Sequence, residues 1–378
     1  MQKVWVNIPD VLFFQEGPGV RNTQYTTEGV KLLNVANLVD GKVDLSTSDR
    51  YISEEEAYGK YEHFLCDTGD FIVASSGIKV EYIDKKMGFV DETMLPLCMN
   101  TSTIRFKVLD VNQLRIRYFM YYLKSQHFKN QLYKQITGSA QLNYGPSHLK
   151  KMIMPLIPLN KQDEIVSCMD KVQNIIEMRQ KELEHLDDLI KARFVEMFGD
   201  PVSNSYGLPE ATLPELGEFG RGVSKHRPRN DPKLLGGEYP LIQTGDVANA
   251  GLYITSYNSA YTELGLKQSK MWDKGTLCIT IAANIAKTAI LEFDACFPDS
   301  VVGFTANERT NNVFIHYWFS FFQAILESQA PESAQKNINL KILSELKVIV
   351  PEKNKLDAFV EFINQVDKSK FVDVLMVV

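Results

Sequence analysis

The longest periodic pattern of apolar residues in the chain lies between residues 161 and 198. Apolar side chains recur there at spacings of three, four and seven, as they do on one face of an α-helix. These positions are Ile165, Met169, Val172, Ile176, Leu183, Leu186, Ile190 and Phe194. The segment contains neither Gly nor Pro, and Gly199 and Pro201 follow it as a stop signal. The pattern predicts one helix of roughly 38 residues, about 55 Å long.

A helix of this length with a narrow apolar stripe and a charged remainder cannot bury itself in one compact domain. Such a stripe is typical of a coiled-coil seam, which requires a partner helix. The alternative is an ordinary core helix of one large domain. That alternative is disfavoured because ordinary helices average about 11 to 12 residues.

The segments on either side of this helix mix strand and helix patterns. Short runs rich in β-branched and aromatic residues predict strands at 30–35, 71–74, 103–108, 277–281 and 347–350. Each side also has one amphipathic, aromatic-rich segment, at 114–135 and at 313–329, that favours a helix. Both sides are therefore expected to fold as mixed α/β modules.

The two modules are related by an internal repeat. Residues 139–141 (Ser-Ala-Gln) recur as residues 333–335, and the same offset of 194 relates Leu149 to Leu343. The offset also relates the long helix to a second helix that begins near Lys353. The apolar positions of that helix are Phe359, Ile363 and Val366. Because the chain returns through a module between them, the two helices are expected to be antiparallel partners.

The expected fold class is therefore α+β, with two similar mixed α/β modules separated by two long antiparallel helices that form a coiled coil. The expected boundaries are 1–158 for the first module, 159–200 for the long helix, 201–351 for the second module and 352–378 for the shorter second helix.

The net charge of the chain and its distribution limit the classes of protein to which the chain can belong. The chain has 378 residues and a formal net charge of −6, which excludes a uniformly basic nucleic-acid-binding protein but not a local basic surface. Residues 221–233 hold five Lys and Arg against one Asp, whereas residues 161–200 hold six against ten Asp and Glu. No apolar run is long enough to span a membrane. The five scattered cysteines fit a reducing cytoplasm better than a disulfide framework.

The sequence lacks the motifs of a catalytic chain. It has no Asn/Asp-Pro-Pro-Tyr/Phe run for methylating a flipped base and no GxxxxGK[S/T] phosphate loop. Its six histidines show no metal-ligand spacing. Neither a catalytic residue nor a metal site is therefore expected.

Residues 158–201 resemble the central helix of Type I restriction–modification specificity subunits. The resemblance lies in the run Pro158-Leu-Asn-Lys-Gln-Asp-Glu-Ile-Val166 and in Arg193-Phe-Val-Glu-Met-Phe-Gly-Asp-Pro201. The Gly-Ser-x-Gln-x-Asn element at 138–143 is similar to the close of that family's target-recognition domains. Together with the two-fold repeat, the resemblance spans nearly the whole chain.

The resemblance implies a non-catalytic DNA-specificity subunit with two target-recognition domains, each reading one half of a bipartite, asymmetric site in double-stranded DNA. It also implies that the paired helices set the spacing of the halves and dock two methyltransferase subunits through the apolar positions named above. Restriction and translocase subunits would join in the full complex. S-adenosylmethionine, Mg and ATP would belong to these partners, and no cofactor to this chain.

The loop at 220–229 has the residue types that DNA reading requires. Cations neutralise phosphates, and side chains with paired donors and acceptors read base edges. The candidates in this loop are Lys225, His226, Arg227 and Arg229. In the first module the counterpart, 17–24, is poorer in charge, and its candidates are Arg21, Asn22 and Gln24. A solvated cationic loop without a ligand is the alternative interpretation.

Further candidates follow predicted strands or belong to the repeated element. Ser76 and Lys79, and in the second module Asn284 and Lys287, come just after a strand, where a domain rim is expected. A simple turn would look the same. The repeated element contributes Gln141, Asn143, Lys336 and Asn337, which could equally cap backbone groups in a turn.

Two other classes of function remain open from the residues alone. The chain could be a coiled-coil scaffold that joins two protein-binding modules, or a stand-alone enzyme with an unrecognised site. A narrower variant keeps DNA reading but pairs the subunit with a fused methyltransferase–nuclease.

Overall fold

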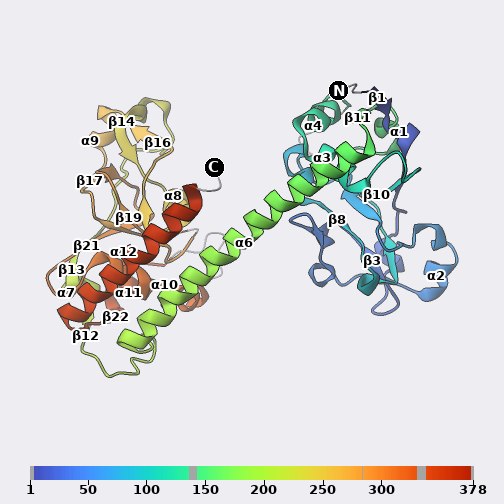
Figure 1. The fold of residues 1–378 in the computed structure, drawn as a ribbon. Coiled ribbons are helices and arrows are strands. Elements are labelled where there is room, and N and C mark those ends of the chain that lie inside the picture. The colour runs from blue at the N-terminus through green and yellow to red at the C-terminus, as the bar shows by residue number, and fades with distance from the viewer. Residues whose placement is uncertain (1–3, 136–142, 283, 330–337, 376–378) are drawn as a thin grey trace. The chain divides into compact units, whose positions relative to one another are not determined.

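The computed structural model of the chain describes residues 4–135, 143–282, 284–329 and 338–375, with side chains described as far as residue 370 except for those of residues 328 and 329. The chain divides into two compact units, residues 1–175 (unit 1) and residues 176–378 (unit 2). Each unit has hydrophobic cores of its own (Figure 1).

Unit 1 contains short strands and helices in alternation. The strands are β1 (Val4–Asn7), β2 (Leu12–Glu16), β3 (Val30–Leu33), β4 (Leu38–Val39), β5 (Lys42–Val43), β6 (Tyr51–Ile52), β7 (Phe71–Ala74), β8 (Met87–Phe89), β9 (Leu97–Met99), β10 (Thr103–Val108) and β11 (Ile153–Leu156). The helices are α1 (Ile8–Val11), α2 (Glu54–Tyr58), the 3₁₀ helix η5 (Val80–Lys85), α3 (Ile116–Lys124), α4 (Gln126–Gln135) and α5 (Pro146–Leu149). The main sheet of the unit is antiparallel, in the order β2-β10-β7-β8.

The single helix expected over 114–135 is two helices, α3 and α4, that meet at Ser125. This residue is extended, and its hydroxyl donates to the carbonyl of Tyr122 at 2.6 Å and accepts from the amide of Phe128 at 3.3 Å. A serine that satisfies backbone groups on both sides stabilises a helix end and a helix start at one position. Apolar periodicity continues through that break, so the pattern alone does not reveal it.

The long helix, α6, spans Leu159–Phe198 as one element of 40 residues, which confirms the expected central helix. It ends at Gly199, whose φ of +78° lies in the left-handed region that favours glycine. A Cβ at this position would also come within 2.5 Å of the Ser205 hydroxyl. Both features require glycine at the end of the helix.

The first turns of α6 are fixed to unit 1. The Gln162 side chain is buried, accepts from the amide of Arg115 and donates to the carbonyl of Ile157, each at 2.8 Å. About two turns further along the helix, Arg117 pairs with Asp170 at 2.6 Å. The polar residues at the start of the long helix therefore hold it against unit 1.

Unit 2 has the same mixture of elements. Its strands are β12 (Glu210–Thr212), β13 (Gly217–Arg221), β14 (Leu235–Leu241), β15 (Tyr253–Ile254), β16 (Ser259–Tyr261), β17 (Met271–Trp272), β18 (Leu277–Thr280), β19 (Thr288–Leu291), β20 (Ala295–Cys296), β21 (Val301–Ala306) and β22 (Lys347–Ile349). Its helices are α7 (Leu213–Leu216), α8 (Thr244–Asn249), α9 (Glu263–Lys267), α10 (Asn312–Gln329), α11 (Leu340–Glu345) and α12 (Lys353–Leu375).

The strand order of unit 1 recurs in unit 2. The sheet order β2-β10-β7-β8 matches β13-β21-β18-β19, and the pair β1-β11 matches β12-β22. The parallel pair β3-β9, with β6 antiparallel beside it, matches β14-β20 with β16. The internal repeat expected from the sequence is therefore present in the strand topology of the described parts.

The two units differ after the central strand of the main sheet. In unit 1, residues 75–86 connect β7 to β8 and include η5, whereas in unit 2 only residues 281–287 connect β18 to β19. In unit 2, β15 also pairs in parallel with β19, an addition that the sheet of unit 1 lacks in its described part. The shape and charge of this rim therefore differ between units of the same topology.

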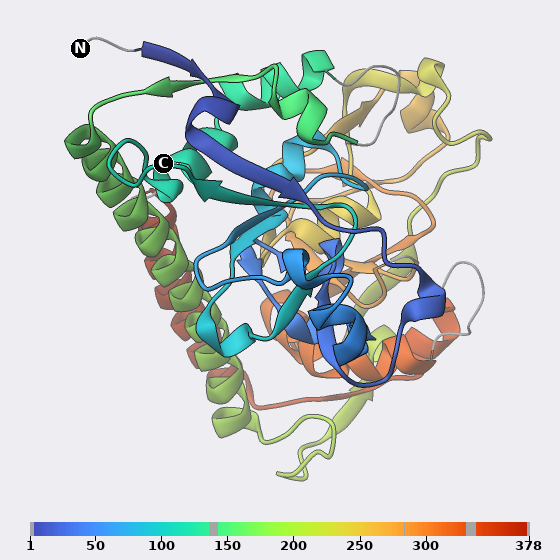
Figure 2. The ribbon, with the colours of Figure 1, turned by 90° about the vertical axis from the view of Figure 1, so that its right-hand side faces the viewer.

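The second helix, α12, lies antiparallel to the second half of α6 within unit 2. The Phe359 ring meets the edge of Phe194 at 5.5 Å, and further along α12 Lys370 pairs with Asp187 at 2.5 Å. Rising residue numbers in α12 therefore meet falling numbers in α6, as expected for antiparallel partners. Figures 1 and 2 show α12 (red) beside the second half of α6 (green).

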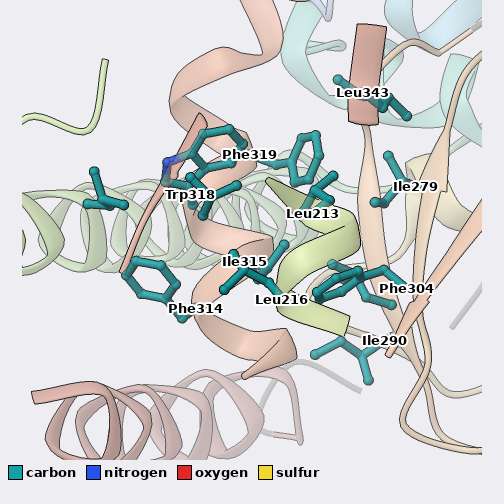
Figure 3. Packing of buried hydrophobic residues seen from close by; sticks show 14 of the residues in the cluster. Leu213, Leu216, Ile279, Ile290, Phe304, Phe314, Ile315, Trp318, Phe319 and Leu343 are labelled. Atoms are coloured by element: carbon teal, nitrogen blue, oxygen red, sulfur yellow. The ribbon is translucent and has the colours of Figure 1, made fainter. Parts of the chain in front are cut away.

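The core of unit 2 joins this helix pair to the sheet through α10. Phe314 stacks on Phe194 at 5.2 Å, and Trp318 and Phe319 are fully buried. Figure 3 shows Phe319 and Ile315 of α10 beside Leu213 and Leu216 of α7, with Phe304 of the sheet beyond them. The burial of these large aromatic side chains among the helix pair, α10 and the sheet stabilises unit 2 as one body.

Candidate nucleic-acid interface

The basic segment at 221–233, here named the cationic loop, is a well-anchored loop at the end of β13. The amide of His226 donates to the Gln268 side chain at 3.0 Å, and the amide of Lys225 donates to the Gln268 carbonyl at 3.3 Å. A Cβ at Gly222 would come within 2.3 Å of the carbonyl oxygen of Phe297. The loop therefore presents its side chains from a fixed backbone.

Part of the charge of the cationic loop is neutralised within unit 2. Asp299 pairs with Arg227 at 3.5 Å and also forms an ion pair with Arg229. His226 contacts Asp231 at 3.0 Å, and the pKa of that carboxyl is lowered by hydrogen bonds from the Lys233 amide and then from His226. Lys225 is exposed and has no ion pair among the described residues. The structure therefore brings the four candidates together, with Lys225 as the one whose charge stays open.

The counterpart loop of unit 1 has a different electrostatic setting. Arg21 and Asn22 are exposed, but the Gln24 amide nitrogen donates to Glu56 at 2.7 Å and to the Tyr61 hydroxyl at 3.0 Å. Glu56 belongs to the acidic first turn of α2, together with residues 54 and 55. Gln24 is therefore engaged inside the unit, and one carboxylate of this acidic turn contacts the loop.

The turn after β7 brings other candidates of unit 1 to one rim. Ser76 and Asn143 form a β-bridge, and Asn143 and Lys79 are exposed. The candidates Gln141, Lys336 and Asn337 lie outside the described residues. Three separate sequence candidates therefore meet at this rim of unit 1.

The sequence interpretation missed two lysines of that rim. Lys79, Lys85 and Lys86, with the exposed ring of Tyr82, line a hollow of about 350 Å³ whose other charged residue is Asp40. The adjacent pair Lys85-Lys86 was visible in the sequence. Its proximity to Lys79 depends on the fold of η5, which no local pattern predicted.

In unit 2 the turn after β18 faces a larger groove. Asn284 is exposed, and Lys287 lines a groove of about 1290 Å³ with lysines of α6 and α12 and with His316. Burial lowers the pKa of His316 to about 4, and it raises the pKa of Asp367 on the facing helix. His316 is therefore neutral at pH 7, and the positive charge in the groove comes from its lysines.

The apolar positions expected to dock partners divide into two groups. On the first part of α6, Ile165, Met169 and Val172 are each more than 40% exposed. Ile176, Leu183 and Leu186 are partly buried. The remaining positions lie in the core of unit 2, and these are Ile190, Phe194, Phe359, Ile363 and Val366. This last group cannot offer a surface to another chain, which corrects the expectation for these five residues.

Other site types have no support among the residues described. Within those ranges, no group of three or more His, Cys, Asp or Glu is placed to hold a metal ion. All five cysteines are free, and burial raises the pKa of Cys66 to about 12. No helix in the described parts of the chain is both long and apolar enough to cross a membrane.

The sequence matches the family model described as the Type I restriction modification DNA specificity domain twice, at residues 25–187 and 210–371. One relative is a Methanocaldococcus jannaschii protein that is named as the specificity subunit of the type I restriction enzyme MjaX. It is 22% identical to this chain, over 90% of this chain and 80% of that protein. The MjaVIII specificity subunit of the same organism is 24% identical over 48% of this chain and 42% of its own length.

Two solved structures share the fold. One is the S subunit of a Type I restriction–modification system from M. genitalium, with a TM-score of 0.51, 16% identity and coverage of 100% of this chain and 94% of that one. The other comes from a study of type I R-M complex assembly, with a TM-score of 0.50, 15% identity and coverage of 99% and 93%. With two family domains and the matching repeat, the chain belongs to the Type I restriction–modification specificity subunits, the non-catalytic DNA-recognition components of these systems.

Proposed function

We propose that this chain binds a bipartite, asymmetric site in double-stranded DNA, with each unit reading one half. The observation that carries this proposal is the repetition of one strand order in two units that share a single 40-residue helix. Two readers with different loop sequences recognise different half-sites, and a stiff helix sets their separation. Each unit also presents exposed cations on loops at the ends of its main sheet, which is what phosphate binding requires.

Chemistry in this proposal belongs to partner chains in the cytoplasm. Two methyltransferase subunits supply adenine methylation with S-adenosylmethionine, and restriction subunits supply ATP-dependent cleavage with Mg. This chain contributes recognition and geometry. The resemblance of the sequence to the family supports this division of roles.

The test of the proposed function is to express the chain with its methyltransferase partner in a host without other modification, and to map modified adenines. A methylated motif split by a fixed spacer is expected. A gel-shift with the assembled complex should show binding to that motif and not to a scrambled duplex. Assembly without any DNA binding would favour the scaffold function instead.

We further propose that the exposed apolar stripe of α6 docks one methyltransferase subunit. The stripe consists of Ile165, Met169 and Val172, which share one face of α6 and are between 41% and 45% exposed. Contiguous exposed apolar surface of this kind is typical of protein interfaces. The stripe lies on the part of α6 whose polar residues Gln162 and Asp170 are held by unit 1, and its own side chains are exposed there.

Substituting Met169→Glu should abolish co-purification of the methyltransferase, because a carboxylate would be buried without a partner in the interface. Glu164→Gln, on an exposed position of the same helix, is the control and should leave assembly intact. Recovery of the complex with normal stoichiometry from the Met169→Glu chain would contradict this docking surface.

A further inference from the structure

The loop after β7 in unit 1 has the properties of a built phosphate-binding surface. Val80 and Ile83 of η5 are buried in the core of the unit. From α4, the Lys129 ammonium donates to the Glu81 carbonyl at 3.1 Å and pairs with Asp84 at 3.4 Å. The backbone of this loop is therefore fixed on both sides, and side chains that leave it toward solvent start from a rigid frame.

Three lysine side chains extend from this loop, and no ion pair among the described residues neutralises their charges. Lys79 and Lys85 are exposed and Lys86 is partly exposed, and none of them has an ion pair among the described residues. Tyr82, 52% exposed, lies among them at the same hollow. We name these four residues the lysine rim.

Two of the three carboxylates near the lysine rim are already engaged. The Tyr133 hydroxyl donates to Glu81 and lowers the pKa of that carboxyl, while Asp84 is paired with Lys129. Asp40 is the remaining carboxylate at the hollow. Counting Lys129, four lysines face three carboxylates, two of which have partners. The net charge is positive, and it is the lysines that reach solvent unpaired.

The equivalent surfaces of unit 2 show the opposite distribution. Its turn after β18 is short and contributes one cation, Lys287, whereas its cationic loop after β13 contributes five. In unit 1 the loop after β2 has Arg21 alone and adjoins the acidic first turn of α2. A polyanion would be repelled at that edge of unit 1 and attracted to the edge after β7.

We infer that unit 1 holds DNA phosphates with Lys79, Lys85 and Lys86, and that Tyr82 contacts a base or sugar between them. The two units therefore engage DNA through non-equivalent loops of the same fold. This inference rests on the proposed function, because it assumes that the ligand is duplex DNA. Cations position the backbone, and an exposed aromatic ring among them supplies a contact that does not depend on charge.

The test measures DNA affinity of the full chain, assembled with its methyltransferase, as a function of salt concentration. The double variant Lys85→Ala with Lys86→Ala should reduce the slope of log K against log salt by about 1.8, because each phosphate contact contributes about 0.9. Tyr82→Ala should weaken binding by about ten-fold and leave the slope unchanged.

The chain offers a matched control for the charge change. Lys150 and Lys151 form another exposed lysine pair in unit 1, remote in sequence from the rim. Their double alanine variant removes the same two charges and should leave the slope within error of the wild type. Arg21→Ala with Asn22→Ala tests the alternative edge and should also leave the slope unchanged.

Two results would overturn the inference in different ways. If the wild-type complex binds its methylated motif, and the Lys85/Lys86 variant has the same slope as the Lys150/Lys151 variant, the lysine rim does not contact DNA. If the loss appears instead in the Arg21/Asn22 variant, unit 1 uses the loop equivalent to the cationic loop. A wild-type complex that binds no DNA would defeat the proposed function itself. Thermal unfolding of each variant separates loss of contact from loss of fold.

Discussion

In unit 2, one carboxylate partly neutralises the charge of two arginines. Asp299 pairs with Arg227 and with Arg229, and all three side chains are between 36% and 56% exposed. Arg227 also donates to the backbone carbonyl of Ser224 at 2.6 Å. Exposed ion pairs contribute only about 0–1 kcal/mol, so a DNA phosphate can replace Asp299 as the partner of either guanidinium. The carboxylate therefore holds the arginines in place and would compete for them with a DNA phosphate bound at this loop.

Removing this competition should strengthen DNA binding. In the Asp299→Asn variant, the two arginines keep a neutral hydrogen-bond acceptor and lose a negative neighbour. We expect tighter binding to any duplex, with the slope of log K against log salt steeper by about one. Fluorescence anisotropy of the complex across a salt series measures both quantities.

Arg227→Ala and Arg229→Ala should have the opposite effect. Each should weaken binding, and a contact to guanine would also relax one position of the second half-site, at about 1–3 kcal/mol. Weaker binding by Asp299→Asn, together with unchanged binding by both alanine variants, would show that this loop acts through its shape and not its charge.

A second residue-scale prediction concerns pH. His316 has a pKa of about 4 in the folded chain because of its burial, against an ordinary value of 6.5, and it contacts Thr288 at 3.0 Å. The unfolded chain therefore binds a proton at a pH where the folded chain does not. Stability should fall as the pH drops through 6.5 and level off below 4, by about 1–2 kcal/mol between pH 7 and 5.

Urea unfolding followed by the buried tryptophans of unit 2, Trp272 and Trp318, tests this expectation. His316→Gln keeps a polar group toward Thr288 but cannot titrate, so its unfolding free energy should depend less on pH. His185→Gln, at an exposed position of α6, is the control and should behave like the wild type. Equal pH dependence in all three chains would exclude His316 as the responsible group.

The residue types of the candidate interface could be predicted from the sequence. Which of these side chains are free to bind a ligand, and which are already paired inside the unit, could not. Five cations in 13 positions are a local signal, and the cationic loop was found for that reason. The pairing of Arg229 with Asp299 and of Gln24 with Glu56 joins residues 70 and 32 positions apart. No local pattern encodes such contacts, so the remaining open charges become visible only in the folded units.

At the scale of elements, the two helices of the repeat have opposite environments at equivalent positions. Ile165 and Phe359 are related by the offset of 194, yet Ile165 is 41% exposed and Phe359 is fully buried. The same holds for Val172, 45% exposed, and Val366, 6% exposed. Within unit 2 the shorter α12 covers the second half of α6, whereas the equivalent face on the first half is exposed in unit 1.

This difference predicts the cost of the same substitution at two equivalent sites. Phe359→Ala should destabilise unit 2 by about 3–5 kcal/mol, because it leaves a cavity among Phe194, Phe198 and Tyr317. Ile165→Ala should cost less than about 1 kcal/mol in the isolated chain. Urea unfolding of both variants measures the two values, and similar costs would contradict the assigned burial.

The elements that could be predicted are those with strong local periodicity. The long helix was expected from about 161 to 198 and spans Leu159–Phe198, and the strand at 103–108 has the expected limits. Ser125 divides a helix through side-chain hydrogen bonds that apolar spacing does not register. The 3₁₀ helix η5 was missed because its fold depends on contacts with α4, far along the chain.

At the scale of the whole molecule, the repeat assigns the common frame and the surface charge to different parts of each unit, the frame to the sheets and the charge to the loops. Equivalent strand orders preserve a common frame, whereas the loops after equivalent strands carry different charges in the two units. In the proposed function, asymmetric recognition therefore requires only loop changes, and the sheets need not change. In the proposed function, α6 would set the spacing between the half-sites, and it contains no Gly or Pro to bend it.

The length of α6 should therefore set the spacer of the recognised site. We expect four residues of helix-forming sequence inserted after Gln180 to lengthen the spacer by about two base pairs, because they add about 6 Å of helix and base pairs rise about 3.4 Å. This position lies between Asp170, which Arg117 of unit 1 holds, and Asp187, which Lys370 of α12 holds. The same four residues inserted after Ser203, in the turn beyond the helix, add chain without lengthening α6 and should leave the motif unchanged. Mapping modified adenines in hosts that carry each variant shows both half-sites and the spacer directly. Altered half-sites with an unchanged spacer would show that α6 does not act as the ruler of this subunit.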